Sequence, residues 1–354
     1  MKFDIENFSS VLIANRGEIA CRIVKTAKKC GLKTIVVYTH ADKDSPHVKL
    51  ADKAILIGDG PVKESYLSIP KIINAALSSK AEAIHPGYGF LSENADFAIA
   101  CEKNGLIFVG PKSHSIKIMG NKAEAKKIVS SVGVPCIPGS DLIVNTRNEI
   151  SSVATTVGYP LMIKAVAGGG GKGMRLVNHE SELHSALKLA KAEGLNSFGS
   201  DEVILERAII SARHVEIQIF GDSYGNVIHL GERDCSVQRR HQKIVEEAPC
   251  PVISQKISQS MGDIAVKAAK KIKYVGAGTV EFLLDDAGNF YFLEMNTRLQ
   301  VEHPVTELVT NLDLVYLQFL IADGQTLPVS QDEVTFNGHA IEIRLCAEDP
   351  TKEF

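Results

Sequence analysis

The chain has 354 residues, of which 45% are hydrophobic and 23% charged, and its formal net charge is −3. This length allows two or three domains of ordinary globular composition, and the small charge gives no reason to expect nucleic acid or an anionic membrane as a partner. No apolar run approaches the roughly 18 residues of a membrane span, and residues 1–6 lack the pattern of a signal peptide.

The first hundred residues alternate predicted strands (11–14, 34–38, 83–84, 106–109) with helices (19–27, 69–77, and one through Phe97 that ends near Gly105). This order predicts an α/β fold with a parallel sheet covered on both faces. The first strand is followed by Asn15-Arg16-Gly17-Glu18 instead of Gly-x-Gly-x-x-Gly, so a dinucleotide site is not expected.

The segment His85–Asn94 follows the end of a predicted strand, which is where open α/β sheets bind ligands. The alternative is a turn capped by Ser92, with Glu93 near the N-terminus of the next helix. The residues alone leave both interpretations open.

A predicted helix (122–132) stops at Gly133 and leads through a proline-containing connector into a small α/β unit. That unit has predicted strands at 161–166, 174–177 and 203–206 and a helix at 180–192. The glycines at 168–171 expose consecutive backbone N–H groups, which suits a phosphate, although a flexible hairpin is the simpler alternative. Lys164 is positioned for a phosphate oxygen, but its alternating neighbours also permit a surface lysine.

From Arg213 onward the pattern is rich in strands, with a long helix at about 252–273. The stretch 233–243 contains five potential cations between apolar strands, which favours anion binding over a solvated run of charges.

The most informative segment is a predicted hairpin of strands 279–284 and 290–293 around the turn formers at 285–289. Pairing would place Glu281 opposite Glu294, with Cβ atoms about 4.5–5.5 Å apart, and Asn296 on the same strand face as Glu294. A divalent cation would relieve the repulsion, and Mg²⁺ characteristically binds one or two carboxylates together with substrate phosphates. The alternative is a pair of acids at a solvated sheet edge.

Seven cysteines are scattered without any Cys-x-x-Cys pair, which argues against structural zinc or a disulfide framework. A reducing cytoplasm is the simplest setting, and no catalytic cysteine is expected.

From Val11 to its last residue the chain resembles the ATP-grasp enzymes, and specifically the biotin carboxylases of methylcrotonyl- or propionyl-CoA carboxylase type. The motifs that carry the resemblance are Ile13–Ala20, His85–Asn94, Met119–Lys122, Gly168–Met174, Arg213–Glu216, Gln238–Lys243, Glu246–Pro249 and Glu294–Glu307. One departure is Asn121, where the family more often has aspartate.

The resemblance implies a Rossmann-like N-terminal domain (1–119), a connector and lid (120–208) and an incomplete ATP-grasp C-terminal α+β domain (209–354). It also implies a reaction in which ATP activates bicarbonate as carboxyphosphate and the released CO₂ carboxylates biotin. The implied cofactors are ATP, Mg²⁺ or Mn²⁺ and biotin. The implied partners are bicarbonate, a biotin carrier domain and a carboxyltransferase subunit, with a homo-oligomer in the full-length enzyme; a eukaryotic enzyme would reside in the mitochondrial matrix.

The resemblance also assigns site residues. Arg298, Glu302 and Lys243 are the implied catalytic residues, with Glu302 as the base on bicarbonate. The implied ligands of ATP are Lys122, Lys164, Gly170, Gly171, Glu206, Arg207, Ala208, Ile209, His214, Gln238 and His241. Bicarbonate and biotin would be surrounded by Lys243, Arg298, Gln300, Val301 and Arg344, and metal would be held by Glu281, Glu294 and Asn296.

Two rivals remain. Another ATP-grasp ligase, related to carbamoyl-phosphate synthases or purine-pathway carboxylases, would share the glycine loop and the Glu/Glu/Asn set but not the segment from Arg298 to Glu302 with Lys243. A regulatory nucleotide-binding module without turnover would not need Arg298 and Glu302.

The chain stops in a polar connector after a predicted strand at 340–345, and it contains no Met-Lys-Met segment for attaching biotin. Because the family's C-terminal domain continues further, we expect an N-terminal fragment that acts on biotin supplied in trans. We also expect such a fragment to be less stable and less active than a longer chain, because uncovered apolar faces tend to associate.

Overall fold

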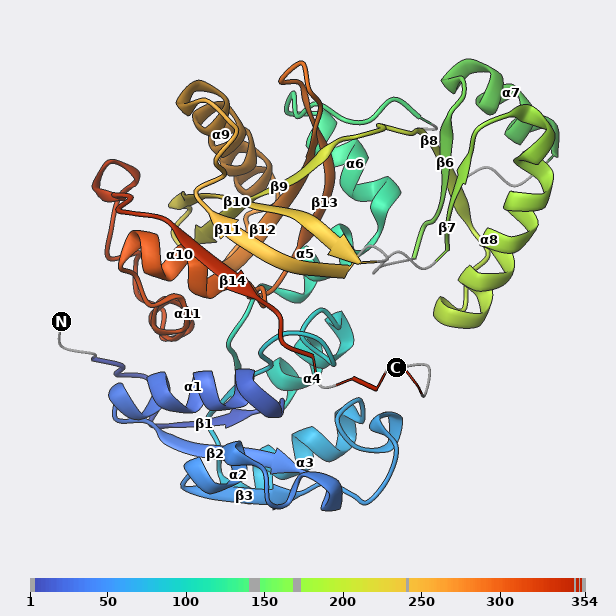
Figure 1. The fold of residues 1–354 in the computed structure, drawn as a ribbon. Coiled ribbons are helices and arrows are strands. Elements are labelled where there is room, and N and C mark those ends of the chain that lie inside the picture. Colours follow the sequence, from blue (N-terminus) through green and yellow to red (C-terminus); the bar gives the residue numbers. More distant parts are fainter. Residues whose placement is uncertain are drawn as a thin grey trace.

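The computed structural model describes residues 4–139, 147–167, 173–239, 242–346, 348–349 and 351. Within them the chain forms a five-stranded, a three-stranded and a six-stranded sheet. The five-stranded sheet lies at one end of the molecule, and the three-stranded sheet projects beside the six-stranded one (Figure 1). The predicted α/β class is therefore confirmed.

The N-terminal sheet is parallel and has the order β3-β2-β1-β4-β5, as the alternating pattern predicts. Its strands are β1 (Ser10–Ile13), β2 (Lys33–Tyr38), β3 (Lys53–Leu56), β4 (Ala83–His85) and β5 (Ile107–Phe108). The accompanying helices are α1 (Gly17–Lys29), α2 (Pro46–Leu50), α3 (Ile69–Ser79) and α4 (Ala95–Lys103), with 3₁₀ turns η1 (His40–Asp42) and η2 (Val62–Glu64). The sequence analysis did not anticipate β3 and α2, which are short elements with weak periodicity.

The expected cap of the fourth helix is wrong by two residues. Asn94, and not Ser92, is the N-cap of α4, and its Oδ1 accepts a 2.9 Å hydrogen bond from the backbone N–H of Phe97. Asparagine and serine are about equally good N-caps, so the sequence offered no basis for choosing between them.

Helices α5 (Ser113–Gly120) and α6 (Lys122–Ser130) lead from the parallel sheet toward the three-stranded unit. Asn121, the residue that departs from the family pattern, is the N-cap of α6 and accepts 3.1 Å bonds from the backbone N–H groups of Ala123 and Glu124. Asparagine here does what aspartate would do, so the departure leaves the start of α6 intact.

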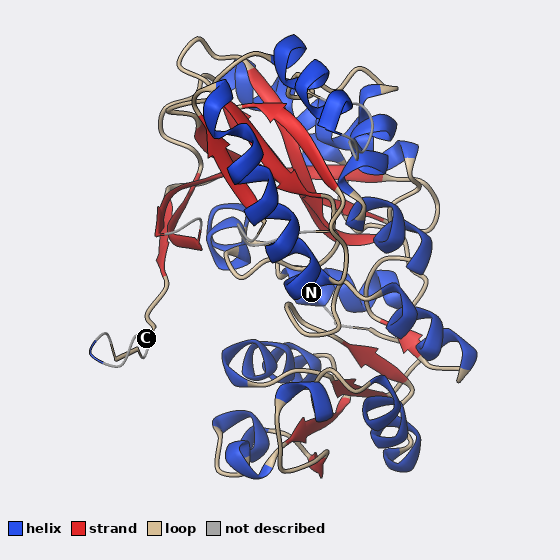
Figure 2. Ribbon diagram, turned by 90° about the vertical axis from the view of Figure 1, so that its right-hand side faces the viewer, coloured by secondary structure: helices blue, strands red, loops and turns tan. Residues whose placement is uncertain are grey.

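The three-stranded unit has the order β7-β6-β8 and is antiparallel. It comprises α7 (Arg147–Val157), β6 (Leu161–Ala165), β7 (Met174–Val177), η3 (Glu180–Glu182), α8 (Leu183–Phe198) and β8 (Val203–Arg207). The strands match the prediction, whereas α7 was not expected and α8 ends six residues later than expected. Ile150, Leu161, Leu183 and Leu205 belong to a hydrophobic core confined to this unit. The unit forms a separate lobe on the right of Figure 1, the side that faces the viewer in Figure 2.

The six-stranded sheet is antiparallel, with the order β13-β12-β9-β10-β11-β14. Its strands are β9 (Arg213–Gly221), β10 (Val227–Arg239), β11 (Gln242–Ala248), β12 (Gly276–Leu284), β13 (Phe290–Asn296) and β14 (Ala340–Ile343). The other elements of this part are α9 (Gln255–Lys271), α10 (His303–Thr310), α11 (Leu314–Ala322) and η4 (Gln331–Glu333).

Helix α11 joins the two large sheets. Residues 314–321 of this helix are buried, and all of them except Gln318 share one hydrophobic core with Val11 and Val36 of the parallel sheet and with Phe220 of β9. Among the described residues no single helix is long and apolar enough to cross a membrane; only α10 together with α11, which are bent by 95°, meets the criterion of length and composition.

A bulge in the β12–β13 hairpin sets the direction of the polar side chains. The register passes from Glu281↔Glu294 to Phe282↔Phe292, so Leu293 is the extra residue. Side chains of a regular strand alternate between its two faces, so residues three apart would point to opposite faces. Phe292 and Met295 nevertheless both belong to the core, and the extra residue of the bulge makes this possible. The bulge thereby turns Glu294 and Asn296 to the face opposite the core.

Candidate active site

The predicted hairpin is confirmed, since Glu281 of β12 lies directly opposite Glu294 of β13. Glu281 is buried, and its Oε1 accepts hydrogen bonds from Asn296 Nδ2 at 2.7 Å and from Lys243 Nζ at 2.8 Å. Glu294 instead pairs closely with the ammonium of Lys122. The alternative of a solvated pair of edge acids is therefore wrong, because each carboxylate holds a cation.

Lys243 of β11 lies at the centre of the acidic cluster. Its Nζ contacts the carboxylates of Glu216, Glu281 and Glu302, the last two at 2.8 Å. Burial alone would lower the pKa of Lys243, but these carboxylates outweigh it and hold the pKa well above its ordinary value. Burial would likewise raise the pKa of Glu281, yet Lys243 and His214 hold it well below the ordinary value. Lys243 and Glu281 are therefore both charged at neutral pH.

The segment after β13 brings the predicted base between two cations. Glu302 has no exposed surface; its Oε1 accepts from Lys243 and its Oε2 accepts from Arg344 Nη2 at 3.0 Å. Arg344 reaches it from the end of β14, 42 residues away in sequence. These two hydrogen bonds fix the position of the Glu302 carboxylate between an ammonium group and a guanidinium group.

Arg298 and Gln300 extend this arrangement toward the metal candidates. Arg298 Nη1 donates to Gln300 Oε1 at 3.0 Å and Nη2 to Asn296 Oδ1 at 3.3 Å, while Gln300 Nε2 donates to Glu281 at 3.3 Å. Burial would lower the pKa of Arg298, but Glu93 and its other acidic neighbours raise it. Neighbouring Val301 is half-buried.

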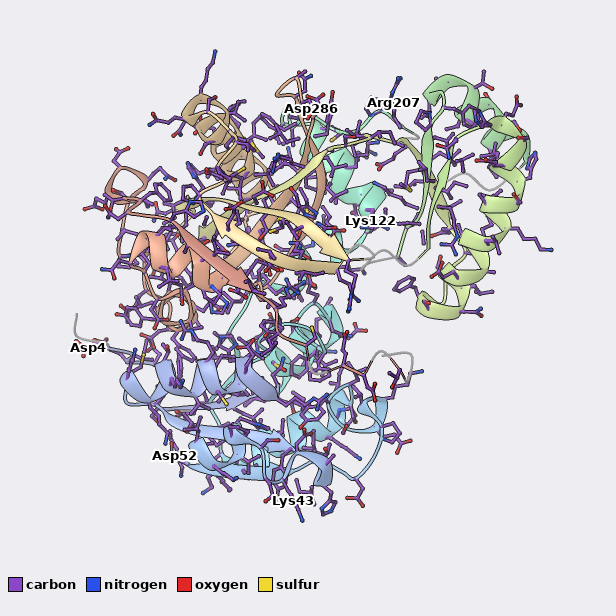
Figure 3. The ribbon with its side chains drawn as sticks, in the orientation of Figure 1. Asp4, Lys43, Asp52, Lys122, Arg207 and Asp286 are labelled. Carbon is purple, nitrogen blue, oxygen red and sulfur yellow. The ribbon has the colours of Figure 1, made fainter. Side chains whose placement is uncertain are left out.

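Predicted phosphate-binding lysines gather on the other side of Glu294, between the six-stranded sheet and the three-stranded unit. Lys122, which Figure 3 shows at this place, lines one small cavity with Lys126, Lys164 and Glu206. Lys164 is buried and donates to Glu206 Oε2 at 2.5 Å, so the surface-lysine alternative is wrong. Burial would raise the pKa of Glu206, but Lys164 and Lys126 hold it below the ordinary value.

The end of β8 lies beside the connector that follows α6, and an isolated β-bridge joins Glu206 to Gly139 of that connector. The backbone N–H of Arg207 donates to Pro138 O at 2.8 Å, and that of Ala208 to Pro160 O at 3.0 Å. A Cβ on Gly139 would lie 2.5 Å from Leu205 O, so only glycine permits this approach. Arg207 and Ile209 are not part of the charged cluster. Arg207, the last residue of β8, is exposed where the chain leaves the small lobe (Figure 3), and Ile209 is half-buried.

His214 and Gln238 join the cluster from β9 and β10. His214 Nε2 lies 2.7 Å from Glu281 Oε2, and Gln238 Nε2 lies 2.9 Å from His214 Nδ1. Burial would lower the pKa of His214, but Glu281 raises it above the ordinary value. Three further predicted residues, Gly170, Gly171 and His241, lie outside the described residues.

The stretch of five cations is only partly available to anions. Arg233 is fully buried and donates to Glu216 Oε1 at 2.6 Å, to Gln218 Oε1 at 2.7 Å and to Thr306 Oγ1 at 2.9 Å. Arg239 pairs with Glu348 at 2.8 Å. Anion binding was therefore the wrong interpretation for Arg233, because its guanidinium is paired with the carboxylate of Glu216 inside the protein.

Two residues of the site were missed by the sequence analysis. Glu216 alternates with His214 and Gln218 on β9, and this polar face within a strongly apolar strand was a signal that could have been used. Glu93 was weighed only as a helix-terminal residue, yet its carboxylate accepts from Arg298 Nε at 2.8 Å and from the backbone N–H of Thr297 at 3.0 Å. The segment His85–Asn94 thus contributes to the site.

The donor set suits a hard divalent cation. Glu281 and Glu294 offer carboxylate oxygens, and Asn296 offers its amide oxygen. Oxygen is the ligand atom that Mg²⁺ and Mn²⁺ prefer. In addition, His214, Glu216 and Glu281 have one potential ligand atom each within 4.8 Å of one another. Lysine ammonium groups now contact Glu281 and Glu294, which shows that these positions stabilise positive charge.

Fold and site together define an ATP-grasp protein: a small lobe and a six-stranded sheet face each other across a cluster of lysines and carboxylates. Two family models match the chain, "Biotin carboxylase, N-terminal domain" over residues 7–116 and "Carbamoyl-phosphate synthase L chain, ATP binding domain" over residues 121–330. A biotin carboxylase of Nostoc is 52% identical over all of this chain and 78% of its own length. The chain belongs to the biotin carboxylase family.

Other relatives are longer. The methylcrotonoyl-CoA carboxylase subunit alpha of Dictyostelium discoideum is 54% identical over 99% of this chain, and that match covers 50% of the relative. The chain thus spans about half the length of such subunits.

Solved structures agree with this relationship. The Campylobacter jejuni biotin carboxylase complex with β-γ-ATP superposes with a TM-score of 0.95 at 49% identity, over 97% of this chain and 76% of that one. The biotin carboxylase domain of the Hydrogenobacter thermophilus 2-oxoglutarate carboxylase, described in complex with MgADP, ADP and bicarbonate, also gives 0.95 at 48% identity, over 99% and 77%.

Proposed function

We propose that this chain carboxylates biotin with bicarbonate in an ATP-dependent reaction, the first half-reaction of a biotin-dependent acyl-CoA carboxylase. The observation that carries the proposal is the position of Glu302, whose two oxygens are held by Lys243 and Arg344 next to Arg298. Bicarbonate is a poor nucleophile, so the reaction needs a fixed base beside cations that bind the anion. The structures related to this chain include complexes with nucleotide and with bicarbonate.

ATP is proposed to bind between the small lobe and the six-stranded sheet. Lys122 and Lys164 would neutralise phosphate oxygens, together with the backbone of Gly170 and Gly171, and residues 206–209 would contact the adenine. His214, Gln238 and His241 would line the remaining part of the nucleotide. Because the lysines now pair with Glu294 and Glu206, phosphate binding exchanges one anionic partner of each lysine for another. Lys126, whose Nζ lies 3.4 Å from Glu206 Oε1, would remain beside the buried carboxylate of Glu206.

Glu281, Glu294 and Asn296 are proposed to hold the divalent cation. When bound there, Mg²⁺ supplies charge neutralisation of the transferring phosphoryl group. Lys122 would then leave Glu294 for a phosphate oxygen, so the same carboxylate serves the ammonium in one state and the cation in the other.

Glu302 is proposed to remove the proton of bicarbonate, a contribution of roughly 10²–10⁴-fold for a positioned base. Arg298 would stabilise negative charge on the ureido oxygen of biotin, as an oxyanion hole does. Gln300, Val301, Lys243 and Arg344 would complete the surroundings of bicarbonate and biotin.

The partners follow from the half-reaction. We propose a biotin carrier domain as the donor of biotin, a carboxyltransferase as the next enzyme, and a homo-oligomer for the full-length protein. We further propose the division into domains 1–119, 120–208 and 209–354. None of the seven cysteines, all of which lie within the described residues, forms a disulfide, which supports a reducing compartment such as the cytoplasm.

The decisive assay measures ADP release by the chain with Mg²⁺, bicarbonate and free biotin, each omitted in turn. We expect ADP release that depends on bicarbonate and is stimulated by biotin. ATP hydrolysis that neither bicarbonate nor biotin increases would indicate another ATP-grasp ligase. Nucleotide binding without any turnover would indicate a regulatory module.

A further inference from the structure

Two glutamates outside the proposed reaction face each other at the sheet edge. Strands β11 and β14 are antiparallel, and their register places Glu246 directly opposite Glu342. Directly opposed side chains have Cβ atoms about 4.5–5.5 Å apart. Ile341 and Ile343 are exposed, so Glu342 points from β14 toward the other face of the strand, where Glu246 is fully buried.

Each of these carboxyl groups has one oxygen without a partner among the described residues. Oε2 of Glu246 and Oε2 of Glu342 are both enclosed and accept no hydrogen bond. The other oxygen of Glu246, Oε1, accepts from Arg344 Nε at 2.6 Å. A buried acceptor left unsatisfied costs about 1–3 kcal/mol, and two such acceptors on facing carboxylates would also repel each other.

A single proton resolves both problems. A carboxylic acid can donate where a carboxylate can only accept, and like carboxylates that share a site raise the pKa of one of them. Burial and the charge of Glu246 raise the pKa of Glu342 to about 7. Burial also raises the pKa of Glu246, although Arg344 opposes the shift.

We propose that Glu246 and Glu342 hold one proton between them, and that this singly charged pair positions Arg344 against the carboxylate of Glu302. Arg344 is the shared element, since Nε donates to Glu246 while Nη2 donates to Glu302 at 3.0 Å. Glu246 and Glu342 are thus positioning residues. Their significance for catalysis rests on the proposed function.

The charges around the pair explain why its ionisation matters. The charges that act on Glu342 are those of Glu246 on β11, Glu302 at the start of α10, Arg344 just after β14 and Glu18 on α1. Glu302 and Lys243 also act on Glu246. When the shared proton leaves for solvent, the pair changes from one negative charge to two. Arg344 is then drawn toward the pair and away from Glu302.

The first experiment does not depend on activity. Glu342→Gln replaces the protonated acid by a neutral donor, and Glu102→Gln, at an exposed position in α4, is the control. The raised pKa of Glu342 means that its contribution to stability is complete below about pH 4.5 and is lost as the pH rises through about 7. The melting temperature of Glu342→Gln relative to the unsubstituted chain should therefore increase between pH 5 and pH 8. A difference that stays constant over this range, as expected for Glu102→Gln, would overturn the shared proton.

The second experiment tests positioning. Glu246→Gln removes the charge that holds Arg344 Nε, so the KM for bicarbonate should rise several-fold more than the KM for ATP. Above pH 7 the KM for bicarbonate of the unsubstituted chain should rise relative to that of Glu342→Gln. Equal changes in both KM values would overturn the positioning role. If the unsubstituted chain shows no bicarbonate-dependent turnover, the proposed function fails, whereas the melting experiment still decides whether the proton is shared.

Discussion

Replacing Arg233 with methionine should destabilise the protein severely. The guanidinium has no exposed surface and bonds to Glu216, Gln218, Thr279 and Thr306, which come from β9, β12 and α10. Methionine has a similar length but leaves Glu216 with Lys243 as its only cationic partner among the described residues. Removing one member of a buried ion pair costs about 3–5 kcal/mol, which is roughly a 10²–10⁴-fold change in the unfolding equilibrium.

The measurement is urea unfolding followed by far-ultraviolet circular dichroism, because the chain has no tryptophan. The double variant Arg233→Met with Glu216→Met removes the whole pair, and it should recover part of the loss since apolar replacement of both partners is often tolerated. Arg239→Met, on the exposed end of the same strand, should change stability little. A loss for Arg233→Met no larger than that of Arg239→Met would refute the reasoning.

Three further predictions concern the site and the fold. Glu294→Gln should weaken Mg²⁺-dependent nucleotide turnover more than metal-free nucleotide binding measured by calorimetry; an unchanged Mg²⁺ dependence would remove Glu294 from the metal site. Arg298→Ala should slow biotin carboxylation by about 10²–10³-fold, as for a lost oxyanion donor, with ATP affinity retained; a parallel loss of ATP affinity would make Arg298 a nucleotide ligand. Asn94→Ala removes the bond to Phe97 N–H and should cost about 1 kcal/mol in urea unfolding, whereas Asn94→Asp should retain stability; equal values for the two variants would argue against the cap.

Several features of the site could be predicted from the sequence because they depend on neighbouring residues. The turn formers at 285–289 between two apolar runs determine the hairpin. Its pairing of Leu284 with Phe290 would by itself bring Leu293 opposite Glu281, and the bulge then places Glu294 there. The alternating pattern of the first hundred residues likewise predicts the parallel sheet and its helices. Lys164 was identified as a candidate, although its alternating neighbours allowed a surface position.

The partners of these residues depended on the tertiary structure. The order β13-β12-β9-β10-β11-β14 brings β9 between β12 and β10, so that Lys243, Glu216 and Glu281 meet although they are up to 65 residues apart in sequence. No local pattern encodes that order, because it results from the packing of whole strands on a common core. The same holds for the bulge at Leu293, which the core requires from Phe292 and Met295, and for Glu93, which reaches Arg298 from the other sheet. Sequence therefore determined which chemical groups are present and their local geometry, whereas the packing of strands decided which of those groups share a proton, a cation or a charge.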